Sequence, residues 1–287
     1  MIGEKKKETD DGDIVSFILK PVDGTALPEF KPGQYISLRM RVPGNPYFQI
    51  RQYSLSNVPS KEQYRITVKR YMGKWFEASA DTDSKMRMSY NSTSTAVSSN
   101  SGSGFDGSDP SRPGLVSTAL IDDSHVGDVI ELTHPAGDFC HDPDEASTVP
   151  IVLISAGIGA APLISILNTT LQRHPNKPIS WVHGSRAQVP FEKNVRDLAT
   201  RHPNLRTSFF KTRLADGDVS TFTFDFRVDL KYVKTEDLHL RNGSTKYLIC
   251  GPDKFMFEMD NFLTSNNVNK SQVHFEAYST GSFEFKA

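Results

Sequence analysis

Apolar and polar residues alternate along the first half of the chain. Tyr64, Ile66 and Val68 are separated by charged or polar residues, which is the period-2 pattern of a strand with one buried face. Turn signals such as Lys31-Pro32-Gly33 separate segments of this kind. Strands are predicted at residues 14–19, 34–42, 50–55, 64–71 and 127–132, and a short helix at 113–120. Short strands at this spacing predict an antiparallel β-barrel.

The pattern changes after residue 150. Residues 151–154 are all apolar, as expected of a strand that is buried on both faces of a parallel sheet. Strands are predicted at 151–154, 179–183, 205–211, 246–250 and 273–278, a loop at 216–225, and helices from Pro162 and at 192–201 and 254–264. Because strands alternate with helices, this half is expected to be an α/β doubly wound parallel sheet. The predicted fold class is therefore two-domain, with an antiparallel β-barrel followed by an α/β domain.

Local composition indicates an insertion and a linker. Residues 79–112 are rich in serine and have almost nothing to bury, so they are predicted to be a disordered insertion. This insertion is interpreted either as a tolerated surface loop or as a phosphorylated regulatory loop. Residues 143–149 are acidic and bounded by prolines, as in a linker. The predicted domains are residues 1–142 and 150–287.

The overall composition narrows the class of protein. With 287 residues, 37% hydrophobic and 23% charged, the chain is long enough for two globular domains. A net charge of -1 gives no electrostatic reason to expect binding to nucleic acid or to an anionic membrane. Two cysteines, Cys140 and Cys250, cannot form a disulfide framework, which predicts a reducing, cytoplasmic location. No signal peptide or transmembrane segment is predicted, and the eight histidines show no metal-binding spacing.

A glycine turn follows the apolar run at 151–154. Gly157 and Gly159 come directly after the predicted strand, and Pro162 suits the first turn of the following helix. Glycine allows a backbone to approach a ligand closely, and a helix start offers free N–H groups and a positive dipole to phosphate. The segment Gly157-Ile158-Gly159-Ala160-Ala161-Pro162 is therefore a candidate dinucleotide site. It departs from G-x-G-x-x-G at Pro162, and an ordinary strand-to-helix turn is the alternative interpretation.

Several short strings occur in a fixed order along the chain. They are Lys31-Pro32-Gly33-Gln34-Tyr35, Ile50-Arg51-Gln52-Tyr53-Ser54-Leu55, Gly114-Leu115-Val116-Ser117, Pro135-Ala136-Gly137-Asp138-Phe139, Ile154-Ser155-Ala156-Gly157-Ile158-Gly159, Arg227-Val228-Asp229-Leu230, Cys250-Gly251-Pro252 and His274-Phe275-Glu276. Together with the order of the two predicted domains, they resemble the reductase half of flavohemoglobins, in the ferredoxin–NADP reductase superfamily. The matches run from residue 14 to residue 278 and leave out the serine-rich insertion.

The resemblance implies that FAD binds to the barrel through its pyrophosphate. Arg51 would hold the pyrophosphate, with Gln52 beside it, since a guanidinium group suits phosphate oxygens. Backbone N–H groups at the start of a helix would complete this site, from Gly114, Leu115, Val116 and Ser117. A surface charge with no ligand is the alternative interpretation of Arg51.

The resemblance also places residues around the flavin ring. Tyr53 would stack on the isoalloxazine, Ser54 would hydrogen-bond near flavin N5, and Tyr35 would be a second contact. The alternative is that both tyrosines are core aromatics of the barrel. Glu276 matches the family's carboxylate beside the flavin, which tunes its redox potential. Ser54, Cys250 and Glu276 are thus the candidate catalytic residues.

The nicotinamide dinucleotide, NADH or NADPH, would bind to the second half. Its pyrophosphate would lie on the glycine turn that ends at Pro162, and its nicotinamide near Cys250, Gly251 and Pro252, at the carboxyl end of a strand. Cys250 is alternatively a small buried residue. Ser185 and Arg186 follow the second strand of this half, where a 2′-phosphate would lie. The alternative interpretation of Arg186 is a solvated charge on a loop. The sequence therefore does not distinguish NADH from NADPH.

The chain departs from the family pattern in three places. Ala277, Tyr278, Ser279 and Thr280 replace the usual Cys-Phe-Gly-Pro, although Tyr278 keeps an aromatic ring for the other face of the flavin. The globin half is absent from this sequence, so no haem is expected in this chain. Residues 4–8 are almost wholly charged where the resemblance implies a first barrel strand. Either the chain is a fragment of a longer protein, or the barrel has a ragged edge.

The resemblance implies an NAD(P)H-dependent flavin oxidoreductase that passes electrons to a one-electron acceptor. Nitric oxide dioxygenation, the activity of the family, needs a haem and is not expected of this chain alone. The acceptor would be a separate globin or haem protein, or an iron–sulfur protein. A regulatory or scaffold protein that has kept the fold and lost catalysis is the alternative of a different class.

Overall fold

The computed structural model describes residues 1–73, 113–142, 148–214 and 223–278. The predicted insertion at 79–112 and most of the predicted linker lie outside the described residues. Ser279 and Thr280 also lie outside them.

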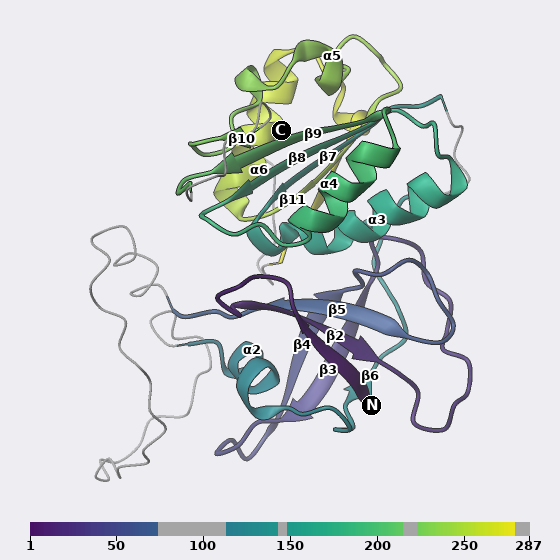
Figure 1. Cartoon of the computed structure of the whole chain (residues 1–287), viewed down its shortest axis with the longest axis vertical. Coiled ribbons are helices and arrows are strands. Elements are labelled where there is room, and N and C mark those ends of the chain that lie inside the picture. Colours follow the sequence, from purple (N-terminus) through teal and green to yellow (C-terminus); the bar gives the residue numbers. More distant parts are fainter. Residues whose placement is uncertain (74–112, 143–147, 215–222, 279–287) are drawn as a thin grey trace.

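The N-terminal half contains two antiparallel three-stranded sheets (Figure 1). Its strands are β1 Ile2–Lys7, β2 Ile14–Leu19, β3 Tyr35–Arg41, β4 Phe48–Ser54, β5 Tyr64–Lys69 and β6 Glu131–Leu132. One sheet has the order β1-β2-β5 and the other β4-β3-β6. A bridge between Leu55 and Ile66 joins the sheets on one side, and backbone hydrogen bonds from Ile2 to Asp128 and from Gly127 to Ile2 join them on the other. The predicted antiparallel barrel is therefore confirmed.

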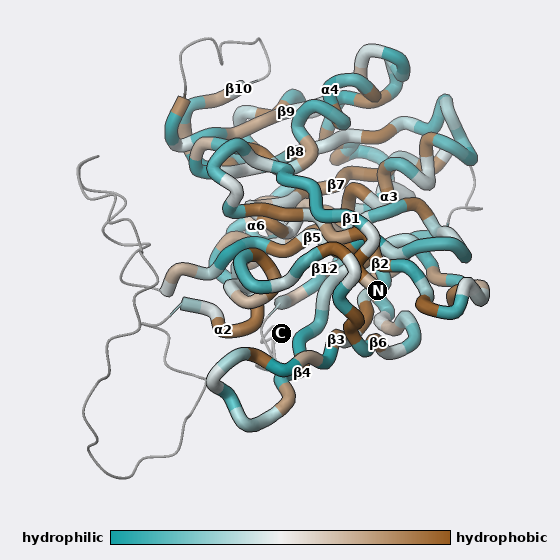
Figure 2. The backbone as a smooth tube through the Cα atoms, turned by 60° about the horizontal axis from the view of Figure 1, so that its bottom comes forward, coloured by the Kyte–Doolittle hydropathy of each residue, from teal (hydrophilic) through white to brown (hydrophobic). Residues whose placement is uncertain are grey.

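Alternate residues of these strands form the core of the barrel. Phe17, Leu19, Ile36, Leu38 and Ile66 are each at most 2% exposed and belong to one hydrophobic cluster. Their spacing of two residues along each strand places them all on the inner face. Figure 2 shows hydrophobic residues concentrated along the strands and hydrophilic residues on the surrounding loops.

The charged segment at residues 4–8 belongs mostly to strand β1, so the first barrel strand is present despite its charge, with a shift of register between Ile2 and Glu4. β1 pairs with β2 along its length, with Lys5 opposite Phe17 and Lys7 opposite Val15. Strand pairing needs only the backbone, and a lysine can lay its apolar stem on a neighbour while its amino group reaches a polar partner. The Lys5 ammonium donates to the carbonyls of Ile121 and Ser124, at 3.1 and 2.6 Å.

The region after the insertion differs slightly from its prediction. The helix expected at 113–120 is α2 Leu115–Thr118, followed directly by a π-helical turn, Ala119–Asp123. The strand expected at 127–132 is reduced to β6, because Gly127 has a φ of +101° and forms a turn whose N–H donates to Ile2.

The C-terminal half is a parallel sheet of six strands, as predicted (Figure 1). The strands are β7 Ile151–Ala156, β8 Ile179–Ser185, β9 Leu205–Lys211, β10 Thr223–Phe224, β11 Lys246–Cys250 and β12 Val273–Glu276, in the order β10-β9-β8-β7-β11-β12. The helices are α3 Ala160–Arg173, α4 Glu192–Arg201, α5 Thr235–Leu238 and α6 Asp253–Ser265. Two separate hydrophobic clusters, one including α3 and α4 residues and one including α5 and α6 residues, lie on the two faces of the sheet. The sheet is therefore doubly wound.

Two short elements of this half were not predicted. β10 lies inside the segment expected to be a loop at 216–225, and α5 follows it. Neither is long enough to show a periodic pattern in the sequence.

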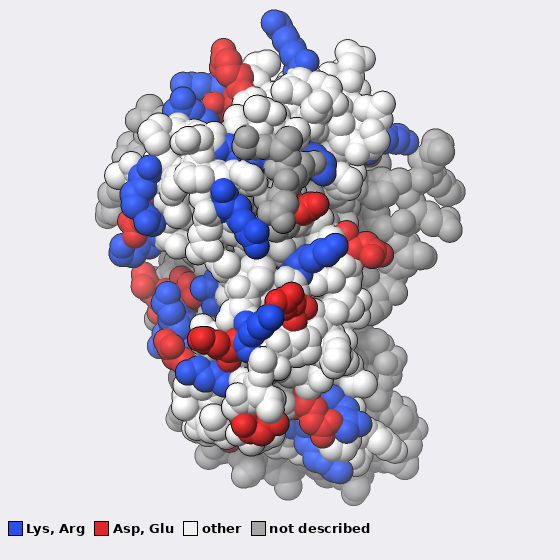
Figure 3. Space-filling model, turned by 90° about the vertical axis from the view of Figure 1, so that its right-hand side faces the viewer, with Lys and Arg blue, Asp and Glu red and all other residues white. Residues whose placement is uncertain are grey.

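The described surface carries mixed charge. Figure 3 shows basic and acidic side chains interspersed on one face of the molecule. Within the described ranges, no helix combines the length and apolar character needed to cross a bilayer.

Candidate functional site

The strand β4 carries the predicted flavin residues toward the boundary between the two halves. Arg51 and Gln52 are exposed, Tyr53 is half-buried, and Ser54 is 5% exposed. A guanidinium N–H of Arg51 donates to the carbonyl of Ile50 at 2.7 Å, so the side chain folds back along its own strand. Burial raises the pKa of the Tyr53 hydroxyl to about 12, which keeps that hydroxyl protonated.

Tyr35 lies opposite Ser54 on the neighbouring strand. Its ring lies against Gly137, where an added Cβ would be 2.9 Å from two ring carbons. Gly137 also has a φ of +108°, which favours glycine. Two backbone hydrogen bonds between Tyr35 and Ala136, at 2.9 and 2.8 Å, hold this contact. The structure therefore places Tyr35 beside the predicted flavin strand.

The segment Gly114-Leu115-Val116-Ser117 begins α2, and no side chain caps this helix start. The Gly114 N–H donates to the Tyr71 carbonyl at 2.7 Å, and the Ser117 hydroxyl donates to the Gly114 carbonyl at 3.2 Å. An added Cβ at Gly114 would lie 2.6 Å from the Ser117 hydroxyl oxygen. A side chain at Gly114 would thus crowd Ser117, and no side chain caps the helix start.

The predicted dinucleotide turn is a 3-10 turn between β7 and α3, formed by Gly157, Ile158 and Gly159. Gly157 has a φ of +56°, and an added Cβ there would meet nothing within 4 Å. No side chain caps the start of α3, whose first three residues are Ala160, Ala161 and Pro162. A long helix whose start has no side-chain cap, next to a glycine with open space around it, fits a phosphate group.

The same turn packs directly on the end of β11. An added Cβ at Gly159 would lie 2.1 Å from the Cys250 carbonyl oxygen, and one at Gly251 would lie 2.6 Å from a ring carbon of Phe255. Only glycine permits these approaches. The turn and the segment Cys250-Gly251-Pro252 therefore lie together at the carboxyl ends of adjacent parallel strands, where sheets of this kind bind ligands.

Tyr278 connects this corner to the flavin strand. Its hydroxyl donates to the carbonyl of Ile158 at 3.1 Å, and the side chains of Cys250 and Ser54 lie close enough to influence its pKa. Burial of the hydroxyl is the main cause that raises the pKa of Tyr278 well above its ordinary value. The residue as a whole is 44% exposed, so the hydroxyl is its more buried part. Ser54 and Cys250, predicted from two separate strings, and Tyr278, from the segment that departs from the family pattern, are thus brought together.

Glu276 completes the corner, opposite Cys250 in the β11–β12 register. Burial, with a contribution from the negative charge of Asp138, raises the pKa of the Glu276 carboxyl to about 7. The Cys250 thiol is fully buried, and burial raises its pKa, so it is not an activated nucleophile. The sequence did not identify Asp138 as a site residue, although the resemblance strings contain it.

Ser185 and Arg186 lie apart from this corner, at the carboxyl end of β8. Arg186 is exposed, and the Ser185 hydroxyl donates to the carbonyl of Gln188 within the same loop. Ser155 and His183 form a buried pair beside them that the sequence did not single out, with 2.8 Å between Oγ and Nδ1. Burial lowers the pKa of His183 to about 3, so its ring is neutral.

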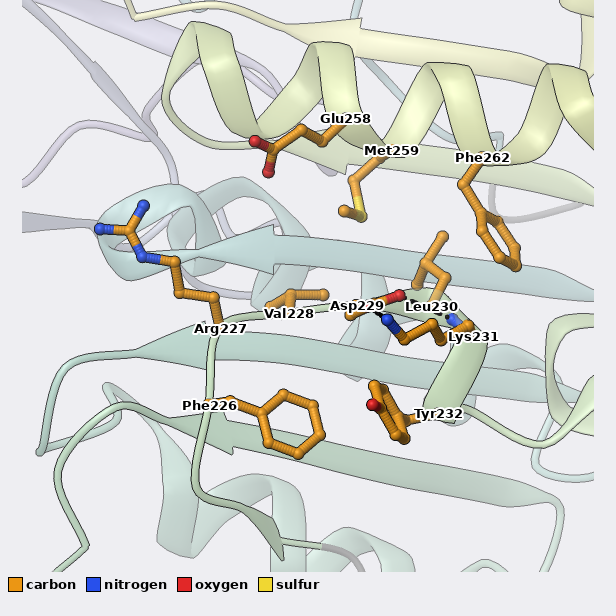
Figure 4. Close-up of a pocket in the computed structure, with 10 residues that line it drawn as sticks. All are labelled: Phe226, Arg227, Val228, Asp229, Leu230, Lys231, Tyr232, Glu258, Met259 and Phe262. Carbon is orange, nitrogen blue, oxygen red and sulfur yellow. Dashed lines mark hydrogen bonds and ion pairs between the residues drawn. The ribbon is translucent and has the colours of Figure 1, made fainter.

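A groove of about 610 Å³ opens on the α6 side of the sheet (Figure 4). Phe226 and Tyr232 form one wall, with their ring centres 4.6 Å apart, and Met259 and Phe262 of α6 face them. The sequence assigned none of its lining residues to a cofactor, and its only signal was the string that begins at Arg227.

The donor sets fit the two predicted cofactors. An arginine and an uncapped helix start near the flavin strand suit a pyrophosphate, and the open glycine turn at α3 suits a second one. Over the described ranges, no group of three or more potential metal ligands is found.

Comparison with known proteins supports this geometry. Residues 153–260 match the family described as oxidoreductase NAD-binding domain. The chain is 30% identical over 276 residues to a flavohemoprotein of Bacillus subtilis, covering 95% of the chain and 57% of the relative. It is 33% identical over 278 residues to a flavohemoprotein of Halalkalibacterium halodurans, covering 96% and 58%. The chain thus spans less than two thirds of the length of these relatives.

Solved structures show the same fold. The flavohem-like FAD/NAD-binding domain of nitric oxide dioxygenase from Vibrio cholerae is similar with a TM-score of 0.73 and 28% identity, covering 96% of both chains. The cytochrome b5 reductase domain of nitrate reductase from Ulva prolifera is similar in fold, with a TM-score of 0.68 and 17% identity, covering 96% of this chain and 95% of that one.

The fold and the comparisons together indicate the class of protein, which is an oxidoreductase with an NAD-binding domain and the fold of an FAD/NAD-binding reductase module. Within that class, the chain resembles the reductase half of flavohemoglobins over nearly its whole length, and the predicted resemblance is confirmed.

Proposed function

We propose that this chain accepts a hydride from NADH or NADPH and passes the electrons to a separate one-electron acceptor. The observation that carries the proposal is the meeting of Ser54 from the flavin strand with Cys250 and Tyr278 from the nucleotide half. FAD, when bound, takes up two electrons as a hydride and releases them singly. The residues of the chain supply binding, orientation and exclusion of water.

The proposed flavin site lies on β4 and at the start of α2. Arg51 and Gln52, which are exposed, are available to the pyrophosphate together with the N–H groups of Leu115 to Ser117. Tyr53 and Tyr35 would lie beside the ring, and the Ser54 hydroxyl would donate a hydrogen bond to it.

The proposed nucleotide site lies on the other half. The turn from Gly157 to Pro162 receives the pyrophosphate, and Gly251 and Pro252 bound the nicotinamide beside Cys250. Ser185 and Arg186 lie at the adenosine end, at the carboxyl end of β8. The proposal covers both nucleotides. The positive charge of Arg186 suits the 2′-phosphate of NADPH, and it does not prevent the binding of NADH, which has no such phosphate.

Glu276 is proposed to hold a proton beside the flavin near neutral pH. Its raised pKa and its place opposite Cys250 support this role. Ala277 and Tyr278 continue from it, and Tyr278 is proposed to cover the face of the flavin that the nicotinamide approaches. Ser279 and Thr280, which were predicted to line the cofactor site, remain predictions.

The proposed acceptor is a globin or another haem protein. The relatives that match along this chain are named flavohemoproteins, and the chain corresponds to 57 to 60% of their length. Both cysteines are free thiols, which supports a reducing, cytoplasmic location.

The test is electron transfer by the purified chain to three kinds of acceptor. Ferricyanide should be reduced rapidly with NADH or NADPH. Nitric oxide and oxygen together should be consumed slowly by the chain alone and rapidly after a globin is added. Rapid nucleotide-dependent consumption of nitric oxide without any haem would overturn the proposed acceptor. A purified chain that contains no flavin and cannot be loaded with FAD would instead support the alternative of a lapsed, regulatory protein.

A further inference from the structure

Arg65 of β5 connects the flavin strand to the nucleotide half. Its Nε donates to the Ser56 hydroxyl at 3.0 Å, and its Nη2 donates to the Ser56 carbonyl. Ser56 lies two residues after Ser54 and is fully buried. The planar guanidinium also lies over the ring of Phe191, with Cζ 5.3 Å from the ring centre. One side chain thus contacts the end of the flavin strand and the start of α4.

Phe191 has an unusual backbone conformation at this contact. Its φ of +61° lies in the left-handed region, which costs free energy for a residue with a bulky side chain. Its ring is 5% exposed, and its carbonyl accepts the N–H of Val195 at the start of α4. Such a conformation persists only where the surroundings hold it, and Arg65 forms one side of those surroundings.

Asn57, the residue after Ser56, makes a second contact between the two halves. The Arg65 backbone N–H donates to the Asn57 side-chain carbonyl at 2.8 Å. The Asn57 backbone carbonyl accepts the hydroxyl of Ser165 at 2.6 Å, and Ser165 is a fully buried residue of α3. The corner Ser56-Asn57 therefore contacts α3, which begins at the dinucleotide turn, and also α4 through Arg65.

The guanidinium is shielded from water. Burial lowers the pKa of Arg65 and the nearby negative charge of Glu8 acts in the opposite direction, while an arginine remains protonated in either case. The Glu8 side chain is only 6% exposed. A stacked cation is held more strongly when it is desolvated, so this contact is expected to resist separation of the halves.

We propose that Arg65 is a positioning residue, which fixes the nucleotide half against the flavin strand through Phe191 and so sets the distance over which the hydride moves. This proposal rests on the proposed function. Reaction rates are sensitive to displacements on the order of 1 Å between reacting groups. Loss of the contact should therefore slow hydride transfer without removing either cofactor site.

The test compares Arg65→Ala, Phe191→Leu and the double variant with the wild type. Phe191→Leu keeps the hydrogen bonds between Arg65 and Ser56 and removes only the stacked ring. Arg206→Ala is the matched control, since Arg206 is an exposed arginine of β9 with a loose ion pair to Asp237. Three quantities are measured: FAD per chain, the Kd of the nucleotide, and the limiting rate of flavin reduction in anaerobic stopped flow.

Both single variants should lower the limiting rate about tenfold, with the double variant no slower than either single one. FAD content and nucleotide Kd should stay within about twofold of the wild type in Phe191→Leu, and the control should be unchanged. A normal limiting rate in Phe191→Leu would overturn the proposal, and that variant decides alone if Arg65→Ala does not fold. Failure of the proposed function is distinguishable, because then neither nucleotide reduces the flavin of the wild type.

Discussion

Arg51 is the only basic residue of β4, and the proposed flavin site depends on it more than on any other side chain. Arg51→Ala should remove a charge-assisted contact to the pyrophosphate, at a cost of about 2–3 kcal/mol, or roughly a hundredfold in FAD affinity. FAD content after purification and the Kd of FAD by fluorescence quenching measure this loss. Arg39→Ala is the control, because Arg39 pairs with Glu131 on the same sheet. A full complement of FAD in Arg51→Ala would mean that the flavin site lies elsewhere.

Glu276 should make stability depend on pH in a defined direction. Its carboxyl pKa is about 7 in the folded chain and near 4.5 when unfolded. Below both values the carboxyl is protonated in both states, whereas above its unfolded pKa the unfolded state gains stability by ionising. The free energy of unfolding of the wild type should therefore fall relative to Glu276→Gln as pH rises from about 5 to about 8. Urea unfolding at several pH values measures the difference, and parallel curves for the two proteins would contradict the assigned environment.

At the scale of elements, the turn between β7 and α3 is set by its contact with β11. Gly159→Ala would place a Cβ 2.1 Å from the Cys250 carbonyl oxygen, so the turn must shift away from the strand. We expect a loss of about 1–3 kcal/mol in the free energy of unfolding, together with weaker nucleotide binding. Gly243→Ala is the matched control, since a Cβ there would meet nothing within 4 Å. Equal stability of the two variants would show that the close approach does not constrain the turn.

Sequence patterns were sufficient to predict the bounds of several helices and strands. Helix α4 and strands β9 and β11 have the predicted bounds, because each has a clear periodicity between turn signals. Strand β1 was missed because the hydrophobic pattern depends on side chains, whereas the pairing of β1 with β2 uses the backbone. The carbonyl that accepts from Lys5 belongs to Ile121, which is distant in the sequence. Likewise, the sequence predicted Ser54, Cys250 and Tyr278 separately, but only the fold shows that their side chains lie close together. The stacking of Arg65 on Phe191 had no sequence signal, since it joins strand β5 of the barrel to the residue that precedes α4 in the other half.

At the scale of the whole molecule, the halves are arranged so that a site forms between them. α3 lies at the boundary with the barrel in Figure 1, and its Ser165 hydroxyl is bonded to Asn57 of the barrel. The barrel supplies Ser54, and the parallel sheet supplies Cys250, Glu276 and Tyr278. Neither half alone contains both the donor and the acceptor side of the proposed hydride transfer.

The central claim is that a hydride crosses this boundary, and its most direct measurement is anaerobic reduction of the bound flavin by nucleotide deuterated at the transferred position. With NADH or NADPH in excess, the flavin absorbance of the FAD-loaded chain should bleach in a single turnover. It should bleach more slowly with the deuterated nucleotide, because the transferred hydrogen is then the heavier isotope. A flavin that stays oxidised with both nucleotides, in a chain that holds FAD and binds nucleotide, would contradict the account.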